Sequence, residues 1–280
     1  MKTKTKELFS RIKKTIYMPQ MLLLPGQLAF FLVLAIIPTM TLITYGASVL
    51  NLSTDFLYDF LQKAFSSEIA GLLLSSSAVN NAGLKLTIVI LICYYISSNG
   101  MNSIIVTSNT IYGIKNGNWF QRRLKAIVMS IIFVTIVLFI LLVPIFGDHI
   151  IYLIESVNLN PSITNIIIRI YQYLQSPIVW IILFLFIKII YILAPDRKIK
   201  SHNANYGAIF TTVAWILIST LYSFYINNLA NYTAFYGNLT SICVLMIWIY
   251  LLTYSFVIGM SLNNLKEVDE LVKTGVIKRK

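Results

Sequence analysis

The sequence predicts an all-α, polytopic membrane protein with six transmembrane helices, both termini in the cytoplasm, and further amphipathic helices at the membrane surface. Of the 280 residues, 58% are hydrophobic and only 11% are charged, whereas soluble domains carry about 25% charged residues. Several apolar runs also reach the roughly 20 residues that a helix needs to cross about 30 Å of hydrocarbon. We expect a membrane domain over residues 19–264, between a basic cytoplasmic arm at 1–18 and a basic tail at 265–280.

The distribution of positive charge predicts the orientation. Of the 22 Lys and Arg residues, 18 fall in the arm, in two short loops and in the tail, which the predicted spans place on one side. Basic loops stay in the cytoplasm. The net charge of +12 therefore indicates topology and anionic lipid headgroups, and no nucleic-acid partner is expected. The first apolar run lacks a small-residue cleavage site, so we expect it to remain as a span.

The arm and the first span come first in the chain. Leu8, Ile12 and Ile16 recur at helical spacing, which favours a basic amphipathic helix on an anionic leaflet; a solvated tail that only sets topology is the alternative. The first span, about 22–50, is so long that it must tilt or kink, and Pro38 is the expected kink because it removes one backbone hydrogen bond.

The second span contains a polar cluster. An amphipathic segment at 55–74 precedes it and is predicted to lie on the outer surface or against the bundle. The span begins at Leu84 and is expected to break after Ile96, where residues 97–103 are mostly polar. Polar groups at that depth face the bundle interior or a wet cavity. They predict either a substrate site or hydrogen bonds between helices, with Gly100 allowing close packing.

The remaining spans are predicted at about 126–146, 177–194, 206–229 and 239–262. An outer interfacial helix is expected at 165–175, separated from the fourth span by Pro177. It carries Arg169, which is predicted to anchor the helix at the interface or to contact an anionic headgroup or a substrate.

The closing stretch resembles a known family. Its features are Tyr236-Gly237-Asn238-Leu239-Thr240, then Trp248 and Tyr250, then Gly259 to Asn264, and Ala29-Phe30-Phe31 with Pro38 and Gly207-Ala208 with Trp215 add to them. This order is similar to that of the YihY/BrkB family of bacterial inner-membrane proteins, although Thr240 and Ser261 stand where that family usually has Gly and Glu. The resemblance implies a multi-pass protein of the bacterial inner (plasma) membrane.

No catalytic site is predicted. The family has carried a ribonuclease label, but metal-dependent hydrolysis needs several converging His and Asp ligands. His149 and His202 are expected on opposite faces of the membrane. No Gly-Lys-Ser/Thr phosphate loop or Gly-x-Ser-x-Gly elbow occurs. We therefore expect no enzyme activity, metal or cofactor.

The sequence favours a transporter or flippase-like protein for a lipid or another amphiphile. The residues expected to contact substrate are Gln27, Ser97, Ser98, Asn99, Asn102, Asn109, Arg169 and Asn263, and those expected to kink or pack helices are Pro38, Gly100, Pro177, Gly207, Gly237 and Gly259. The alternative is a scaffold protein of the cell envelope without transport activity, and a membrane-bound nuclease is a third hypothesis. The expected partners are membrane lipids, including anionic headgroups at the cytoplasmic face, and a homo-oligomer stays open.

Overall fold

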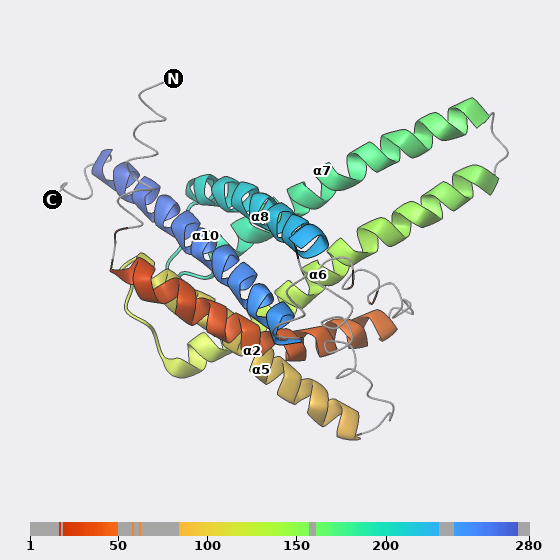
Figure 1. The fold of residues 1–280 in the computed structure, drawn as a ribbon. Helices are drawn as coiled ribbons and strands as arrows, with labels where there is room; N and C mark the ends of the chain where they lie inside the picture. The colour runs from red at the N-terminus through yellow and green to blue at the C-terminus, as the bar shows by residue number, and fades with distance from the viewer. Residues whose placement is uncertain are drawn as a thin grey trace.

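The described part of the chain consists of helices and the loops that connect them. The computed structural model describes residues 19–49, 84–156, 161–229 and 238–273, together with the single residues 17, 58 and 62. Within these ranges lie six helices: α2 (Gln20–Val49), α5 (Leu84–Ile111), α6 (Trp119–Ser156), α7 (Pro161–Leu193), α8 (Ser201–Leu229) and α10 (Asn238–Lys273) (Figure 1). No strand occurs in these ranges, so the expected all-α class is confirmed for them.

The six helices pack as a closed ring. Following the chain, α2 packs on α5, α5 on α6, α6 on α7, α7 on α8 and α8 on α10, and α10 returns to α2. The inner faces share one apolar core, to which each helix contributes fully buried or almost fully buried side chains. They include Leu28, Ile105, Ala126, Ile187, Ala208 and Val257.

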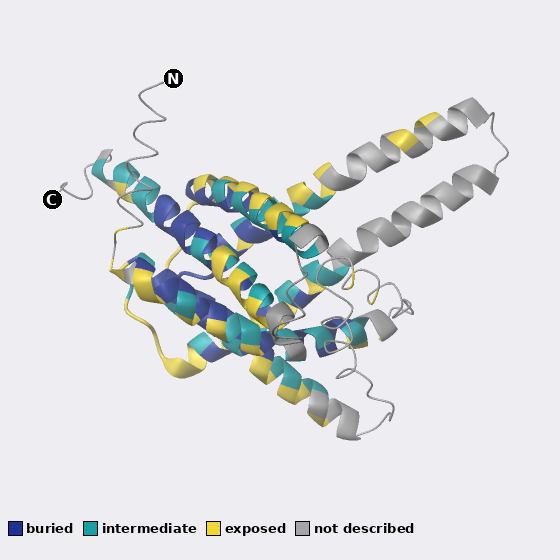
Figure 2. Ribbon diagram, viewed as in Figure 1, coloured by how far each residue is buried: buried dark blue, intermediate teal, exposed yellow. Residues whose placement is uncertain are grey.

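The outer faces are strongly apolar. On α8, side chains three or four residues apart are 52–68% exposed, namely Ile209, Val213, Leu217, Leu221 and Phe224. Figure 2 shows that exposed positions follow the outer sides of the helices, whereas buried ones face the centre. Soluble proteins rarely expose so continuous an apolar stripe, and its helical spacing is that of a surface in contact with lipid.

Three helices in the described ranges are long and apolar enough to cross a membrane, namely the stretches Ile90–Ile111, Ser201–Ile226 and Ile242–Glu270. A fourth is α2, if its two parts, Met21–Ile36 and Pro38–Gly46, count as one span bent by 47°. The expected kink at Pro38 is therefore confirmed. The full count of six spans stays a prediction.

Two expected interruptions are wrong. The polar cluster does not break its helix, because α5 is continuous from Leu84 to Ile111. Likewise, α7 is one helix from Pro161 to Leu193 and runs through Pro177, so 165–175 is not a separate interfacial helix. Ser and Asn leave the backbone hydrogen bonds intact when neighbouring helices satisfy their side chains, and proline is tolerated in membrane helices.

Some predictions lie outside the described residues. These are the basic arm at 1–18 and the amphipathic segment at 55–74, apart from Tyr17, Tyr58 and Gln62, and also Gly237. The tail is described in part: α10 continues through residue 264 and ends at Lys273.

Candidate functional site

A cavity of about 270 Å³ lies at the centre of the ring. All six helices line it, for example through Leu32, Met101, Phe133, Phe186, Trp215 and Leu252. A cavity formed by the inner faces of six helices is accessible only to a group that fits between them. It is therefore the candidate binding site of the molecule.

The few polar side chains that line the cavity already have partners within the protein. The hydroxyls of Thr39 and Ser97 lie 2.8 Å apart and share a hydrogen bond. Thr253 Oγ1 donates to the carbonyls of Pro25 and Tyr250. The cavity-lining indoles also donate within the protein, Trp215 Nε1 to the Leu252 carbonyl at 3.0 Å and Trp248 Nε1 to Ser219 Oγ at 3.4 Å.

The cavity therefore presents almost only hydrocarbon to its interior. Such a cavity gives water too few partners and makes the burial of a polar ligand costly. What it can accept is an apolar group, and a slender chain suits a partly open space that all six helices line.

Two predicted residues of the polar cluster lie at this cavity. Ser97 lines it through its bond to Thr39, and Gly100 lines it where α5 crosses α2. A Cβ at position 100 would lie 3.1 Å from Leu32 Cδ2 and 3.3 Å from Ala35 Cβ. The expected role of Gly100 in close helix packing is thus visible in the contacts.

The other predicted residues of the cluster, Ser98, Asn99 and Asn102, do not line the cavity. Ser98 donates to the carbonyl of Tyr95 on its own helix. Asn99 accepts a hydrogen bond of 2.7 Å from Nη1 of Arg123, and Asn102 accepts one of 3.1 Å from Nε of Arg122. These two asparagines therefore join α5 to the N-terminal part of α6.

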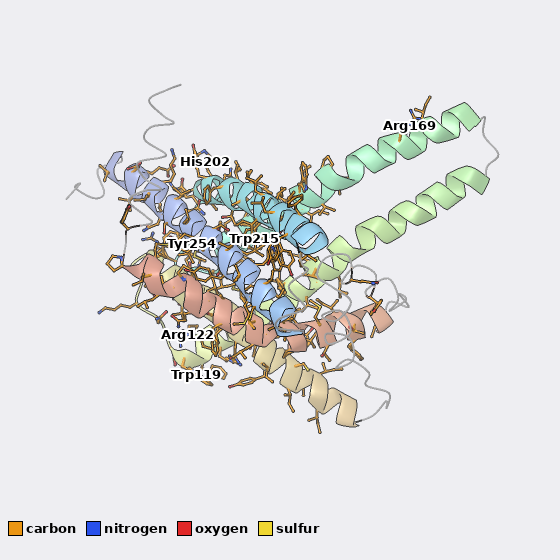
Figure 3. All side chains as sticks on the ribbon, viewed as in Figure 1. Trp119, Arg122, Arg169, His202, Trp215 and Tyr254 are labelled. Atoms are coloured by element: carbon orange, nitrogen blue, oxygen red, sulfur yellow. The ribbon has the colours of Figure 1, made fainter. Side chains whose placement is uncertain are left out.

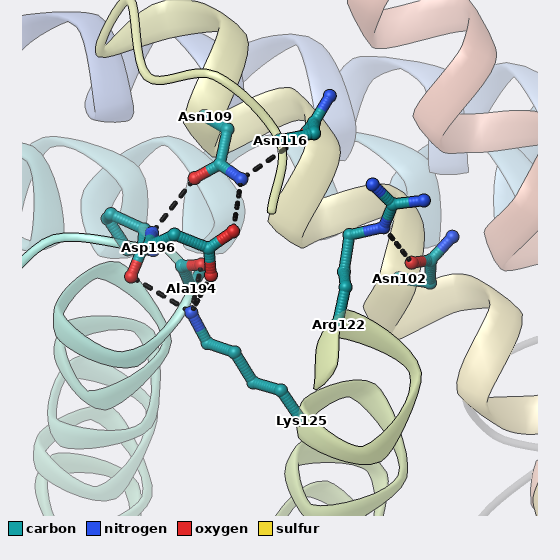
Figure 4. Close-up of polar contacts among 8 residues, drawn as sticks. Asn102, Asn109, Asn116, Arg122, Lys125, Ala194 and Asp196 are labelled. Atoms are coloured by element: carbon teal, nitrogen blue, oxygen red, sulfur yellow. Dashed lines mark hydrogen bonds and ion pairs between the residues drawn. The ribbon is translucent and has the colours of Figure 1, made fainter. Parts of the chain in front are cut away.

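A second polar cluster ties together the ends of α5, α6 and α7 (Figure 4). Asn109 donates to Asn116 and to the Asp196 carboxylate, at 3.0 and 2.7 Å, and its own oxygen accepts from the Asp196 amide at 2.9 Å. Lys125 lies 2.7 Å from the same carboxylate and also donates to the carbonyls of Ala194 and Pro195. Burial would raise the pKa of the Asp196 carboxyl, but the hydrogen bonds from Lys125 and Asn109 outweigh this effect and lower its pKa.

Asn263, Gly207 and Gly259 meet where α8 crosses α10. Asn263 Oδ1 accepts a hydrogen bond of 2.6 Å from the Gly207 amide. A Cβ at Gly259 would collide with the hydroxyls of Thr211 and Tyr191, and one at Gly207 would collide with the Gly259 carbonyl. Both glycines are therefore required by the close approach of the two helices.

The last two predicted residues do not line the cavity. Gln27 is exposed on the outer face of α2. Arg169 is exposed on the part of α7 that extends away from the bundle (Figure 3). Of the eight residues expected to contact substrate, only Ser97 lines the cavity, and a role of the other seven in substrate contact stays a prediction.

The apolar residues that form the site, such as Trp215, Trp248 and Leu245, were not predicted. In a sequence, an apolar residue that lines a cavity looks the same as one that packs in a core, so only polar residues stand out as site candidates. Among the described residues, no group of three or more His, Cys, Asp or Glu side chains could hold a metal ion.

The helical ring, its lipid-facing surface and its apolar centre define an integral membrane protein. Residues 16–275 match the family described as Virulence factor BrkB, and the chain belongs to that family. This confirms the family resemblance seen in the sequence.

Curated relatives agree with this assignment. The ribonuclease-like protein YfkH of Bacillus subtilis is 32% identical over 264 residues, which cover 93% of this chain and 94% of that protein. UPF0761 membrane protein IL2447 of Idiomarina loihiensis is 34% identical over 32% of this chain and 33% of its own length. A UPF0761 membrane protein of Glaesserella parasuis is 23% identical over 57% of this chain and 56% of its own. No solved structure matches the chain.

Proposed function

We propose that this protein is a transporter or flippase-like protein for a lipid or another amphiphile, and that it has no enzymatic activity. The observation that carries the proposal is the apolar cavity at the centre of the ring, whose polar side chains are all bonded within the protein. A lipid chain could occupy this space while its headgroup stays outside the apolar lining.

The proposal includes six spans in the bacterial inner membrane, with both termini in the cytoplasm. The collection of basic residues in the arm, two loops and the tail supports this orientation. Membership of a family whose relatives are named membrane proteins supports the location in a membrane.

A cavity-filling substitution tests the proposal. Leu245 lines the cavity, whereas Leu251 of the same helix is 44% exposed on the outside. Leu245→Trp should fill the space that a lipid chain needs, and Leu251→Trp adds the same bulk on the lipid side. A lipid chain that enters beside the new indole would overpack the cavity at a cost of roughly 1–3 kcal/mol. Since 1.4 kcal/mol is a factor of ten, we expect Leu245→Trp to slow lipid movement about tenfold.

The measurement uses proteoliposomes that contain a fluorescent phospholipid. A membrane-impermeant reductant is added outside the vesicles, where it bleaches the lipid of the outer leaflet. Wild type and Leu251→Trp should move the inner-leaflet lipid to the bleached side at similar rates. The rate should be lower for Leu245→Trp. Equal rates for the two tryptophan variants would contradict a role of the cavity. Wild-type vesicles that bleach like empty ones would contradict lipid transport and favour the scaffold hypothesis.

A further inference from the structure

Two adjacent arginines near the start of α6 have no acidic partner among the described residues. Arg122 and Arg123 lie in the second turn from Trp119, and the first turn of the helix contains no acidic residue. The ion pairs of the described residues use Lys125, Arg197, Lys200 and His202 as the basic partners, and neither Arg122 nor Arg123 is among them. Both guanidinium groups are instead held by neutral oxygens.

Arg123 is fixed in a buried position. Its side chain is only 8% exposed, and its guanidinium lies 3.8 Å from the centre of the Tyr95 ring. Nη1 donates to Asn99 and Nη2 to the Tyr95 carbonyl, but Nε has no hydrogen-bond partner in the part of the chain that the structure describes. A buried cation that has only neutral acceptors is costly, and ionisable groups so placed in membrane proteins usually serve a function.

Among the described residues, Arg122 uses only one of its guanidinium donors in a side-chain hydrogen bond. Its Nε donates to Asn102 at 3.1 Å, and this is the one contact drawn for its guanidinium in Figure 4. The side chain is partly exposed, so a ligand can reach it. The positive end of the α6 dipole adds to the charge of the two arginines.

The surroundings indicate where the counter-charge comes from. Trp119 and Phe120 are 61% and 66% exposed beside the arginines, and Figure 3 shows Trp119 and Arg122 together at this end of α6. The exposed apolar stripe of α6 then continues through Leu124, Val128 and Ile131. Exposed Trp next to Arg is typical of a helix end at the level of lipid headgroups, with the stripe below it facing the acyl chains.

We propose that Arg122, supported by Arg123, binds the phosphate of an anionic phospholipid headgroup at the start of α6. Guanidinium groups bind phosphate through paired N–H donors. The phosphate would provide the negative charge that no acidic side chain of the described ranges provides there. This site is separate from the central cavity and does not depend on transport activity.

Titration calorimetry on the full-length protein in detergent tests this site. The probes are short-chain phosphatidylglycerol, short-chain phosphatidylcholine and inorganic phosphate, and thermal melting checks that each variant is folded. Wild type should bind phosphatidylglycerol in preference to phosphatidylcholine. Arg122→Gln should weaken phosphatidylglycerol binding at least about fivefold, because one basic residue near an anionic surface contributes about 1 kcal/mol, and Arg122→Lys should retain most of it.

Lys198→Gln is the matched control, since it removes one exposed positive charge from the loop between α7 and α8. It should leave phosphatidylglycerol affinity within about twofold of wild type, because charge away from the site acts only through screened interactions. Unchanged affinity in a folded Arg122→Gln variant, or an equal loss in Lys198→Gln, would overturn the proposal. Arg122-dependent binding of inorganic phosphate without binding of phosphatidylglycerol would overturn the lipid assignment and identify a soluble phosphate.

Discussion

At the scale of single residues, the most sharply defined positions are the glycines where α8 crosses α10. Gly207 and Gly259 allow the two backbones to approach, and Asn263 uses the close distance to bond the Gly207 amide at 2.6 Å. Beside them the Tyr191 hydroxyl bonds Thr211 at 2.6 Å and the Phe256 carbonyl at 2.8 Å. Small residues at such crossings are a common basis of helix association in membranes.

Gly259→Ala should therefore destabilise the protein. The added methyl group would collide with the Tyr191 and Thr211 hydroxyls, and overpacking of this kind costs roughly 1–3 kcal/mol. Gly26→Ala is the control, since no atom lies within 4 Å of a Cβ added there and alanine is favoured over glycine in a helix by about 1 kcal/mol. The free energy of unfolding, measured in mixed micelles, should fall for Gly259→Ala and rise for Gly26→Ala. An unchanged free energy of unfolding for Gly259→Ala would contradict the close packing.

At the scale of helices, the ends of α5, α6 and α7 are joined by hydrogen bonds that each involve a side chain. Lys125 donates to the Ala194 and Pro195 carbonyls, where the negative end of the α7 dipole favours a cation. Asp196 then bonds both Lys125 and Asn109, so that one carboxylate connects two helices to the loop after the third.

Asp196 should give the protein a pH-dependent stability. Its pKa is lowered in the folded state, whereas the pKa of Asp in an unfolded chain is about 3.9. Its stabilising contribution is therefore complete above about pH 4 and is lost as the pH falls through the lower, folded-state pKa. Asp196→Asn should cost about 1 kcal/mol at pH 7, because hydrogen bonds to a charged group contribute about 1.5–3 kcal/mol and solvent screens part of this for the partly exposed pair with Lys125.

Thermal melting in detergent between pH 7 and pH 3 checks this prediction. The difference in melting temperature between wild type and Asp196→Asn should be constant down to about pH 4 and shrink below it, because protonation removes the charge in the wild type too. A difference that stays the same at pH 3 would rule out the carboxylate charge as its cause.

The helices also show how far the sequence predicts structure. The kink at Pro38 follows from the chemistry of proline alone and was predicted correctly. The break expected after Ile96 was wrong, because Ser97 is bonded to Thr39, and Asn99 to Arg123, on neighbouring helices. Those partners are 58 and 24 residues away, and a single sequence does not show which distant residues meet.

At the scale of the whole molecule, the ring of helices encloses a centre that no single helix forms. The class of protein and its family were predictable, because run length, composition and motif order lie in the chain itself. The cavity was not, because it is defined by how six helices pack around one space. Most of the predicted polar site residues bond neighbouring elements instead, which matches the helix-bonding interpretation of the second-span cluster for Asn99 and Asn102. Asn263, predicted to contact substrate, bonds the Gly207 amide.

The central claim is that a lipid chain occupies this cavity, and photocrosslinking tests it most directly. The protein is reconstituted with a phospholipid that carries a photoreactive diazirine in its acyl chain, and adducts are mapped by peptide mass spectrometry. We expect adducts at Met40 and Met101, which line the cavity. Leu245→Trp should reduce these adducts about tenfold, because a chain beside the indole would overpack the cavity at a cost of roughly 1–3 kcal/mol. Leu251→Trp should leave the adducts unchanged. Adducts confined to outward-facing residues such as Leu217 and Leu221 would contradict the claim.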